Sequence, residues 1–432
     1  NAGKQRGNEL DEGMKEKHKS LAVAMSPYSK GGNILKKTRG AGSRIHRKRT
    51  VGAKLRSKKA AMEEISIGDE FFPSTKDLPE WQHLMFSVAR VFALLLSIVS
   101  VSFVGSIALA YMTATNAKKK DRRKIANMLE ESLISAIIFI LPRTRIHVTG
   151  TAPTSYTGTK LASEAPKILI MNRATEVDFL YVAMLANEVK HAGHMRAIVK
   201  ANLKMLPVVG PLLSWFRFLF LSGDDEADEL LIDAYMSRMS NSKGEWLVFF
   251  PEPASVSHKQ VKRSRKTAEK TGRPDLKKVL LPQHQVLESC LTHLQNDDTE
   301  VYDLTIQYKG YSGEVPLSSM GWKRDKDVLV PTLLKLLVGH ASNQIHIDSR
   351  LWKLRDVVNH ENGVQGWLDE SFERKDELTK SFIKDQKFPV EGSRDTFTPT
   401  GSLENMLILW GTTSASFFAF TVFAAVLKVV RG

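Results

Sequence analysis

Two long apolar segments bracket the middle of this chain and limit how it can fold. Residues 84–113 carry one charge, that of Arg90, and residues 406–426 carry none. A helix of about 20 apolar residues is long enough to cross the hydrocarbon core of a bilayer. A mostly basic cluster at 118–124 follows the first segment, as is typical of a helix end near lipid headgroups. The sequence therefore predicts membrane insertion of both segments, and a buried core helix is the alternative for each.

Short apolar and β-branched runs alternate with helical patterns between these two segments. Strands are predicted at 167–171, 196–200, 246–250, 301–308 and 344–348, and helices at 226–239, 282–294, 325–337 and 366–384. This alternation is typical of an α/β fold. We therefore predict a mostly parallel sheet flanked by helices.

Five regions follow from these patterns. A basic N-terminal extension (1–80) precedes a membrane helix pair (84–141), whose second half is the more amphipathic. The α/β domain covers residues 142–392. A linker rich in turn residues (393–403) leads into a C-terminal transmembrane helix (404–430).

The positive charge of the chain is concentrated near its start. Of a net charge of +15, +13 falls in residues 1–62. On composition alone the default is a solvated tail, but protein subunits of a large complex, anionic lipid or RNA can supply the counter-charge. Because no aromatic residue lies between Tyr28 and Phe71, base stacking and sequence-specific RNA recognition are not favoured. The candidate partner-binding residues are Lys36, Lys37, Arg39, Arg44, Arg47, Lys48 and Arg49.

Four sequence blocks occur in order within the α/β domain. In the first, an apolar run at 167–171 is followed by Asn172, Arg173, four further residues and Asp178. Together the blocks resemble those of the membrane-bound acylglycerophosphate and lysophospholipid acyltransferases, over roughly residues 140–370. The other three blocks comprise Lys200, Leu203, Pro207 and Gly210, then the Phe-Pro-Glu of 250–252, then Val301–Thr305 with Gly313 and Pro316.

The resemblance implies a catalytic histidine at the position that holds Arg173. In the family, this histidine takes a proton from a glycerol hydroxyl as the hydroxyl attacks an acyl thioester, and the aspartate orients the imidazole. A general base needs a pKa near neutral pH, whereas a guanidinium stays protonated and offers no lone pair. The resemblance therefore implies a degenerate catalytic site at Asn172, Arg173, Asp178 and Glu252.

Two other blocks also depart from the family pattern. The family's Gly-Thr after Phe-Pro-Glu is replaced by Pro253 and Ala254, and proline removes an amide donor from an anion-binding turn. Asp224 and Asp225 follow the second block, where the family carries a phosphate-binding arginine. The remaining candidates for lipid or phosphate binding are Arg173, Lys200, Lys262, Arg263 and Arg265.

A relocated base is the alternative to a lost one. His191, His194 and Glu176 lie close to the first block in sequence, and surface positions are the favoured interpretation for all three. For Arg173, the favoured interpretation is an ion pair with Asp178. A surviving pocket is expected to be lined by residues near Asn172, Leu203 and Phe250.

No metal site and no tightly bound cofactor are predicted. The single cysteine, Cys290, excludes an intramolecular disulfide and a cysteine-type metal cluster, and the twelve histidines are scattered. A bound phospholipid is compatible with the resemblance, and acyl-coenzyme A is expected only if the protein is active. A basic chain that begins at Asn1 and carries helical anchors favours the mitochondrial inner membrane, with the endoplasmic reticulum as the alternative.

Two functions remain open. The first is a catalytically inactive, acyltransferase-like membrane protein that acts as a scaffold subunit of a large, mitochondrial assembly. The second is an active lysophospholipid acyltransferase that takes its acyl group from acyl-coenzyme A or acyl carrier protein and uses a non-standard base. The altered base, phosphate-binding and turn residues favour the first function.

Overall fold

The computed structural model describes residues 79–151, 165–242, 244–294, 298–317, 326–389 and 392–431, without the side chains of 419–420 and 422–431. The basic extension lies outside the described residues, apart from its last two positions. The seven predicted partner-binding residues, from Lys36 to Arg49, are therefore also outside them.

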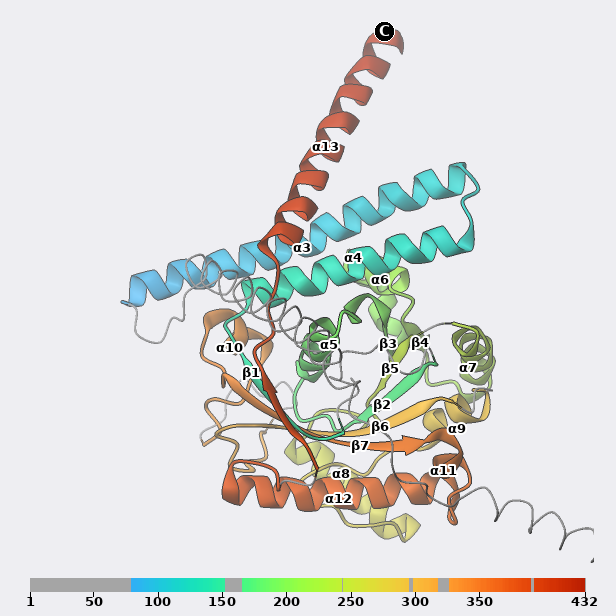
Figure 1. Cartoon of the computed structure of the whole chain (residues 1–432), viewed down its shortest axis with the longest axis vertical. Coiled ribbons are helices and arrows are strands. Elements are labelled where there is room, and N and C mark those ends of the chain that lie inside the picture. The colour runs from blue at the N-terminus through green and yellow to red at the C-terminus, as the bar shows by residue number, and fades with distance from the viewer. Residues whose placement is uncertain are drawn as a thin grey trace, which may run out of the picture. The chain divides into compact units, whose positions relative to one another are not determined.

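In the described part of the chain, eight strands form one sheet in the order β4-β3-β5-β2-β6-β7-β1-β8 (Figure 1). Neighbouring strands are parallel except in the pairs β6–β7 and β1–β8. The predicted α/β fold with a mostly parallel sheet is confirmed. The strands are β1 (Arg145–Gly150), β2 (Lys167–Met171), β3 (Met195–Lys200), β4 (Leu219–Leu221), β5 (Trp246–Phe249), β6 (Glu300–Tyr308), β7 (Gln344–Lys353) and β8 (Arg394–Phe397).

Helices connect and cover these strands. The helix predicted over 325–337 is shorter in the structure, where α10 covers Leu333–Val338. A proline at residue 331 does not favour a continuous helix across this point. The Thr332 hydroxyl caps the start of α10 by accepting the Lys335 amide at 3.2 Å. The helices are α3 (Glu80–Ala114), α4 (Lys119–Ile140), α5 (Asp178–Glu188), α6 (Val209–Trp215), α7 (Asp225–Ser240), α8 (His258–Thr271), α9 (Gln285–Thr292), α10 (Leu333–Val338), α11 (Leu354–Val358), α12 (Gly363–Asp385) and α13 (Leu403–Arg431), with 3-10 turns η2 (Ala192–His194) and η3 (Ala201–Met205).

The sheet has an apolar core on each face. Strand β2 is buried along its whole length, as expected for a central parallel strand covered on both sides. Its Leu169 and Met171 pack with residues of α4 and α5, whereas Ile168 and Ile170 pack with residues of α9 and α12. Figure 1 shows α4 and α5 on the opposite side of the sheet from α8 and α12. The residues that follow β2 therefore emerge between two helical layers.

One side of helix α3 packs against the α/β domain, and the opposite side exposes apolar residues. It contacts α4, α6 and α10, and Arg90 donates to the Leu337 carbonyl of α10 at 3.5 Å. The Ser102 hydroxyl donates to the Val208 carbonyl next to α6 at 3.3 Å. Among the residues whose side chains the structure describes, which leave out much of the last helix, α3 is the one helix long and apolar enough to cross a membrane. Its exposed apolar residues include Leu84, Val88, Phe92, Leu95, Val99 and Ile107.

The segment predicted as a linker contains a strand. Strand β8 pairs with β1 because the outer edge of β1 offers free backbone groups, and the Thr396 hydroxyl lies 2.9 Å from Nδ1 of His147 on β1. Helix α13 then begins at Leu403 and contacts α3 and α4, with the Trp410 indole donating to the Ser97 hydroxyl at 3.1 Å. Membrane insertion of α13 and the limits of the five regions stay predictions.

Candidate functional site

The first and third sequence blocks meet at the carboxyl-terminal edge of the sheet. Strands β5, β2 and β6 are parallel neighbours, so the residues that follow β2 and β5 emerge side by side. Asn172 extends the pairing of β2 with β6, because its side chain accepts the Ile306 amide at 2.8 Å and donates to the Ile306 carbonyl at 3.3 Å. This edge is where ligands bind in open α/β sheets.

Glu252 ties three loops together at this edge. Its two carboxylate oxygens accept the backbone amides of Arg173 and of Leu280, the second at 2.7 Å. The side chain is 3% exposed, and this burial raises the pKa of Glu252 to about 7, while the two amide hydrogen bonds act in the opposite direction. Glu252 therefore holds the backbone at Arg173 and Leu280 together, and burial brings the pKa of its carboxyl group near neutral pH.

Asp178 begins α5 and is held by neutral donors. It accepts hydrogen bonds from the Thr175 amide at 2.9 Å, from the Thr175 hydroxyl at 2.6 Å and from the Tyr308 hydroxyl. Burial raises the pKa of Asp178 to about 6, against the effect of these hydrogen bonds. The predicted ion pair with Arg173 is wrong: among the described residues, the Arg173 guanidinium has no ion-pair partner, because Thr175 and Tyr308 already occupy Asp178.

A small pocket lies beside Arg173. Its water-accessible volume is about 10 Å³, enough for about one water molecule. The expected lining is confirmed near Asn172 and, through Glu252, near Phe250, whereas no residue near Leu203 lines this pocket. The lining residues are Asn172, Arg173, Ala174, Glu252, Val256, Lys278, Val279, Gln307, Tyr308, Tyr311 and Val330.

Comparison with known families identifies this arrangement. The family model described as Acyltransferase matches residues 152–278, and the one described as Acyltransferase C-terminus matches residues 335–410. The chain belongs to the glycerolipid acyltransferase family. The resemblance drawn from the four sequence blocks is thereby confirmed.

Curated relatives of this acyltransferase-family chain carry matching names. It is 30% identical over 253 residues to the "Probable 1-acyl-sn-glycerol-3-phosphate acyltransferase 5" of Arabidopsis thaliana, covering 58% of this chain and 63% of the relative. It is 28% identical to an uncharacterized acyltransferase of Schizosaccharomyces pombe, over 51% of this chain and 61% of the relative. It is 23% identical to the "1-acyl-sn-glycerol-3-phosphate acyltransferase 2" of Arabidopsis thaliana, over 69% of this chain and 73% of the relative. The chain thus spans less than two thirds of the first two relatives.

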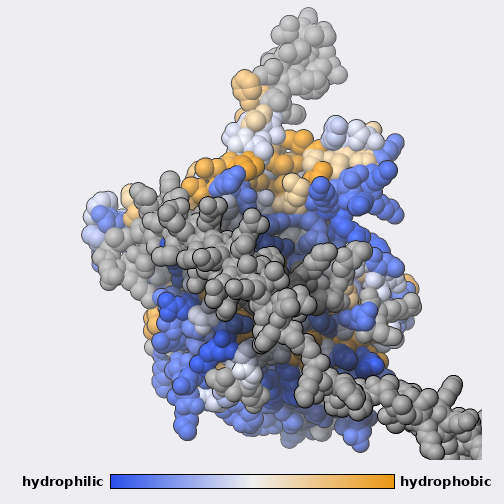
Figure 2. Space-filling model, viewed as in Figure 1, coloured by the Kyte–Doolittle hydropathy of each residue, from blue (hydrophilic) through white to orange (hydrophobic). Residues whose placement is uncertain are grey.

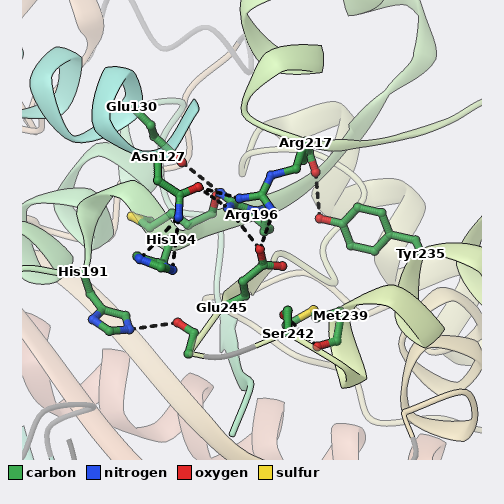
Figure 3. Close-up of polar contacts among 12 residues, drawn as sticks. Asn127, Glu130, His191, His194, Arg196, Arg217, Tyr235, Met239, Ser242 and Glu245 are labelled. Carbon is green, nitrogen blue, oxygen red and sulfur yellow. Dashed lines mark hydrogen bonds and ion pairs between the residues drawn. The ribbon is translucent and has the colours of Figure 1, made fainter. Parts of the chain in front are cut away.

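The two histidines considered as relocated bases lie at the other edge of the acyltransferase sheet. His191 and His194 precede β3, and their rings stack with centroids 5.0 Å apart. His191 Nε2 lies 2.8 Å from the Gly244 carbonyl, and the Asn127 amide contacts the His194 ring (Figure 3). Burial lowers the pKa of His194 to about 4. Their predicted surface positions are wrong, because both side chains are half-buried, and neither lines the Arg173 pocket.

A buried ionic network surrounds these histidines. Arg196 is 0% exposed and donates to Glu130 of α4 at 2.8 Å and to Glu245 at 3.2 Å. Arg217 donates to Glu245 and to the Asn127 side chain, each at 2.6 Å (Figure 3). The network joins α4 to the amino-terminal ends of β3, β4 and β5. Sequence reasoning missed it, since nothing in the pattern around Arg196 marks a partner on a distant helix.

The remaining predicted phosphate ligands do not line the pocket. Lys200 is exposed at the end of β3, and Lys262, Arg263 and Arg265 are exposed on α8. Lys278, which was not among the predicted ligands, lies in the pocket instead.

Acidic residues near the site have structural roles. Asp224 accepts the Ala227 amide at 3.4 Å and caps α7, with Asp225 in the first turn, where a helix dipole favours negative charge. Glu176 accepts the Leu333 amide at 3.3 Å at the start of α10. Neither Asp224 nor Glu176 lines the pocket.

Proposed function

We propose that this member of the acyltransferase family does not catalyse acyl transfer and serves as a membrane-attached scaffold subunit. The observation that carries this proposal is the environment of residue 173. An arginine occupies the position of the family's base, and both carboxylates beside it are already occupied by hydrogen-bond donors.

The occupied carboxylates argue against a replacement base. Asp178 accepts three hydrogen bonds and Glu252 accepts two, so much of the acceptor capacity of each carboxylate already serves the fold. No histidine is among the residues that line the described pocket. The pocket is also far smaller than the roughly 300–1,000 Å³ of ordinary small-molecule sites.

Attachment to a membrane is supported by the outer face of α3. Figure 2 shows hydrophobic side chains gathered along α3. Val208, which contacts Ser102, and its exposed neighbours Met205 and Leu206 extend this apolar surface. Because Arg90 and Ser102 hold the middle of α3 against the domain, a perpendicular crossing would carry polar domain surface into hydrocarbon. We therefore infer that α3 lies along the membrane surface with its outer face toward lipid.

Attachment through α3 can be tested by flotation with liposomes. Leu95→Glu and Val99→Glu place charges on the outer face and are expected to reduce co-flotation at least several-fold. Leu230→Glu, on the exposed surface of α7, is the matched control and should float like the wild type. Equal flotation of all variants would contradict attachment through α3.

The scaffold role concerns the basic extension. Its net charge of +13 in residues 1–62 supports contact with acidic surfaces of other subunits, and the mitochondrial inner membrane is the proposed location ahead of the endoplasmic reticulum. Deleting residues 1–62 is expected to release the chain from its complex on native gels while it stays in the membrane fraction. Unchanged co-migration with a large assembly would overturn this role.

One observation favours an active acyltransferase as the second candidate. Burial brings the pKa of Glu252 to about 7, in the range that suits a general base, and Glu252 lines the pocket next to Arg173. In that case Glu252 would take the proton from the attacking hydroxyl of a lysophospholipid, with acyl-coenzyme A or acyl carrier protein as donor.

An acyl-transfer assay separates the two candidates. The purified full chain is given labelled acyl-coenzyme A or acyl carrier protein with a panel of lysophospholipids, beside Asp178→Ala, Glu252→Gln and the exposed control Asp225→Ala. We expect no turnover above a protein-free blank for any of them. Turnover by the wild type and Asp225→Ala that disappears in Asp178→Ala or Glu252→Gln would overturn the noncatalytic proposal.

A further inference from the structure

We propose that Arg173 and Lys278 form a binding site for a phosphate group at the mouth of the pocket beside β2. The assignment rests on the proposed loss of catalysis, because an arginine that replaces the base is free for another task. The pairing of these two residues is new: Lys278 is not among the predicted phosphate ligands, and Arg173 stands where the family places its base.

The first argument is the pairing of charges. Among the described residues, neither the Arg173 guanidinium nor the Lys278 ammonium has a hydrogen-bond or ion-pair partner. Other cations nearby do have partners: Lys375 pairs with Asp303, and Arg273 pairs with Asp369 at 2.5 Å. Within the described part of the chain, Arg173 and Lys278 make no ion pair and outnumber Glu252, the one carboxylate that lines this pocket, so the balance of charge favours an anion.

The second argument is that both cations project from fixed backbone. The Arg173 amide is held by Glu252, and the Lys278 amide by Asp376, which is itself 3% exposed. A side chain that starts from a fixed Cα loses less freedom on binding, so the two cations are partly preorganised.

The third argument is the space left by Gly313. Its φ is +83°, and a Cβ at this position would lie 2.9 Å from Nζ of Lys278 and 2.7 Å from Ile383. Glycine is thus needed both for the backbone conformation and for the position of the ammonium. Any side chain at residue 313 would push Lys278 aside.

A buried amide adds a further polar group to the pocket. Gln307 is 2% exposed, its Nε2 donates to the Thr379 hydroxyl at 3.1 Å, and its Oε1 has no partner among the described residues. Because a hydroxyl can donate as well as accept, rotation of the amide by half a turn keeps the bond to Thr379 and frees Nε2. Gln307 can therefore supply a donor to an oxyanion.

The size and charge of the pocket define the class of ligand. With about 10 Å³ of accessible volume, it admits an oxygen atom of a phosphate but no acyl chain. Guanidinium groups bind phosphate through paired hydrogen bonds. Glu252 lines the same pocket and opposes deep entry of a second negative charge. Phosphate at the mouth fits these limits, either as the free ion or as a lipid headgroup.

Calorimetry on the full chain in nonionic detergent tests the site. Inorganic phosphate and glycerol 3-phosphate are titrated at constant ionic strength into the wild type, Arg173→Gln, Lys278→Gln and the control Lys277→Gln, an exposed neighbour that pairs with Asp275. Arg173→Gln and Lys278→Gln are expected to weaken binding at least tenfold, while Lys277→Gln matches the wild type. Folding of each variant is checked by its thermal unfolding midpoint.

Flotation distinguishes the two sources of phosphate. The same variants are mixed with phosphatidylcholine vesicles with or without phosphatidate. A phosphatidate-dependent gain that is lost in Arg173→Gln identifies a lipid headgroup, whereas binding of soluble phosphate without such a gain identifies the free ion. Equal affinity of wild type and folded Arg173→Gln for every phosphate probe, or no binding to any of them, would overturn the site. Turnover in the acyl-transfer assay would instead overturn only the noncatalytic function.

Discussion

The two edges of the sheet differ in whether their arginines form ion pairs. At the amino-terminal edge, Arg196 and Arg217 share Glu130 and Glu245, so each arginine meets a carboxylate. At the carboxyl-terminal edge, Arg173 faces a pocket and has no ion-pair partner among the described residues. Removing one partner of a buried ion pair costs stability, because the other charge stays buried without a partner. Leaving a cation unpaired costs little when its charged group reaches water. The comparison teaches that the first edge is built for stability and the second is open to a ligand.

Arg196→Met should have the largest effect, because it leaves Glu130 buried without a cation. We expect a loss of about 3–5 kcal/mol in the free energy of unfolding. Arg173→Met, at the other edge, should change it by less than about 1 kcal/mol. Denaturant titrations in detergent, followed by tryptophan fluorescence, measure both. Equal losses would remove the distinction between the two edges.

Part of the pH dependence of stability should come from the carboxyl-terminal edge, beside a contribution in the same direction from Glu130 at the other edge, where burial raises the pKa of Glu130 to about 8. Burial raises the pKa of Glu252 from 4.5 to about 7, so between these pH values the folded state holds a proton that the unfolded chain has released. Stability from this group is therefore lost as the pH rises through that window, by up to about 3 kcal/mol. Asp178, raised from 3.8 to about 6, acts in the same direction at lower pH.

Glu252→Gln is expected to reduce the slope of this pH profile, because glutamine does not titrate while Glu130 and Asp178 still do. Unfolding curves at pH 5 and pH 8 measure the slope for the variant, the wild type and the exposed control Glu269→Gln. A slope that persists unchanged in Glu252→Gln would show that the carboxyl group is not responsible.

Asp178→Ala should cost about 2 kcal/mol, because it leaves the Thr175 amide and the Thr175 and Tyr308 hydroxyls without an acceptor. Asp225→Ala, in the exposed first turn of α7, should stay within about 0.5 kcal/mol of the wild type. Thermal unfolding midpoints compare the two. A small effect of Asp178→Ala would mean that water replaces the carboxylate as hydrogen-bond acceptor. It would show that solvent reaches this edge of the sheet.

Arg217→Gln should have a smaller effect than Arg196→Met or Asp178→Ala, about 1 kcal/mol. The Arg217 side chain is 28% exposed, and Glu245 keeps Arg196 as a partner. The double variant with Arg196→Met should lose more than the sum of the single losses, since Glu245 then has neither arginine. Additive losses would show that the two arginines act independently.

The motif residues of the site could be predicted, but their partners could not. Asn172 and Glu252 follow the carboxyl ends of the predicted strands β2 and β5, and Asp178 begins α5. The Arg173–Asp178 ion pair was wrong because Tyr308, at the far end of β6, takes that carboxylate. Lys278 was not predicted as a ligand, because no local pattern distinguishes it from the exposed Lys262 on α8.

The sequence by itself determined the strand and helix pattern, the apolar face of α3 and the absence of a proton acceptor at residue 173. These properties depend on local periodicity and on the chemistry of single side chains. Only the tertiary structure decided which charges are paired, that Glu130 of α4 reaches Arg196, and that Arg173 and Lys278 share a pocket. Pairing depends on distances of a few ångströms between groups that are far apart along the chain, and folding alone sets those distances.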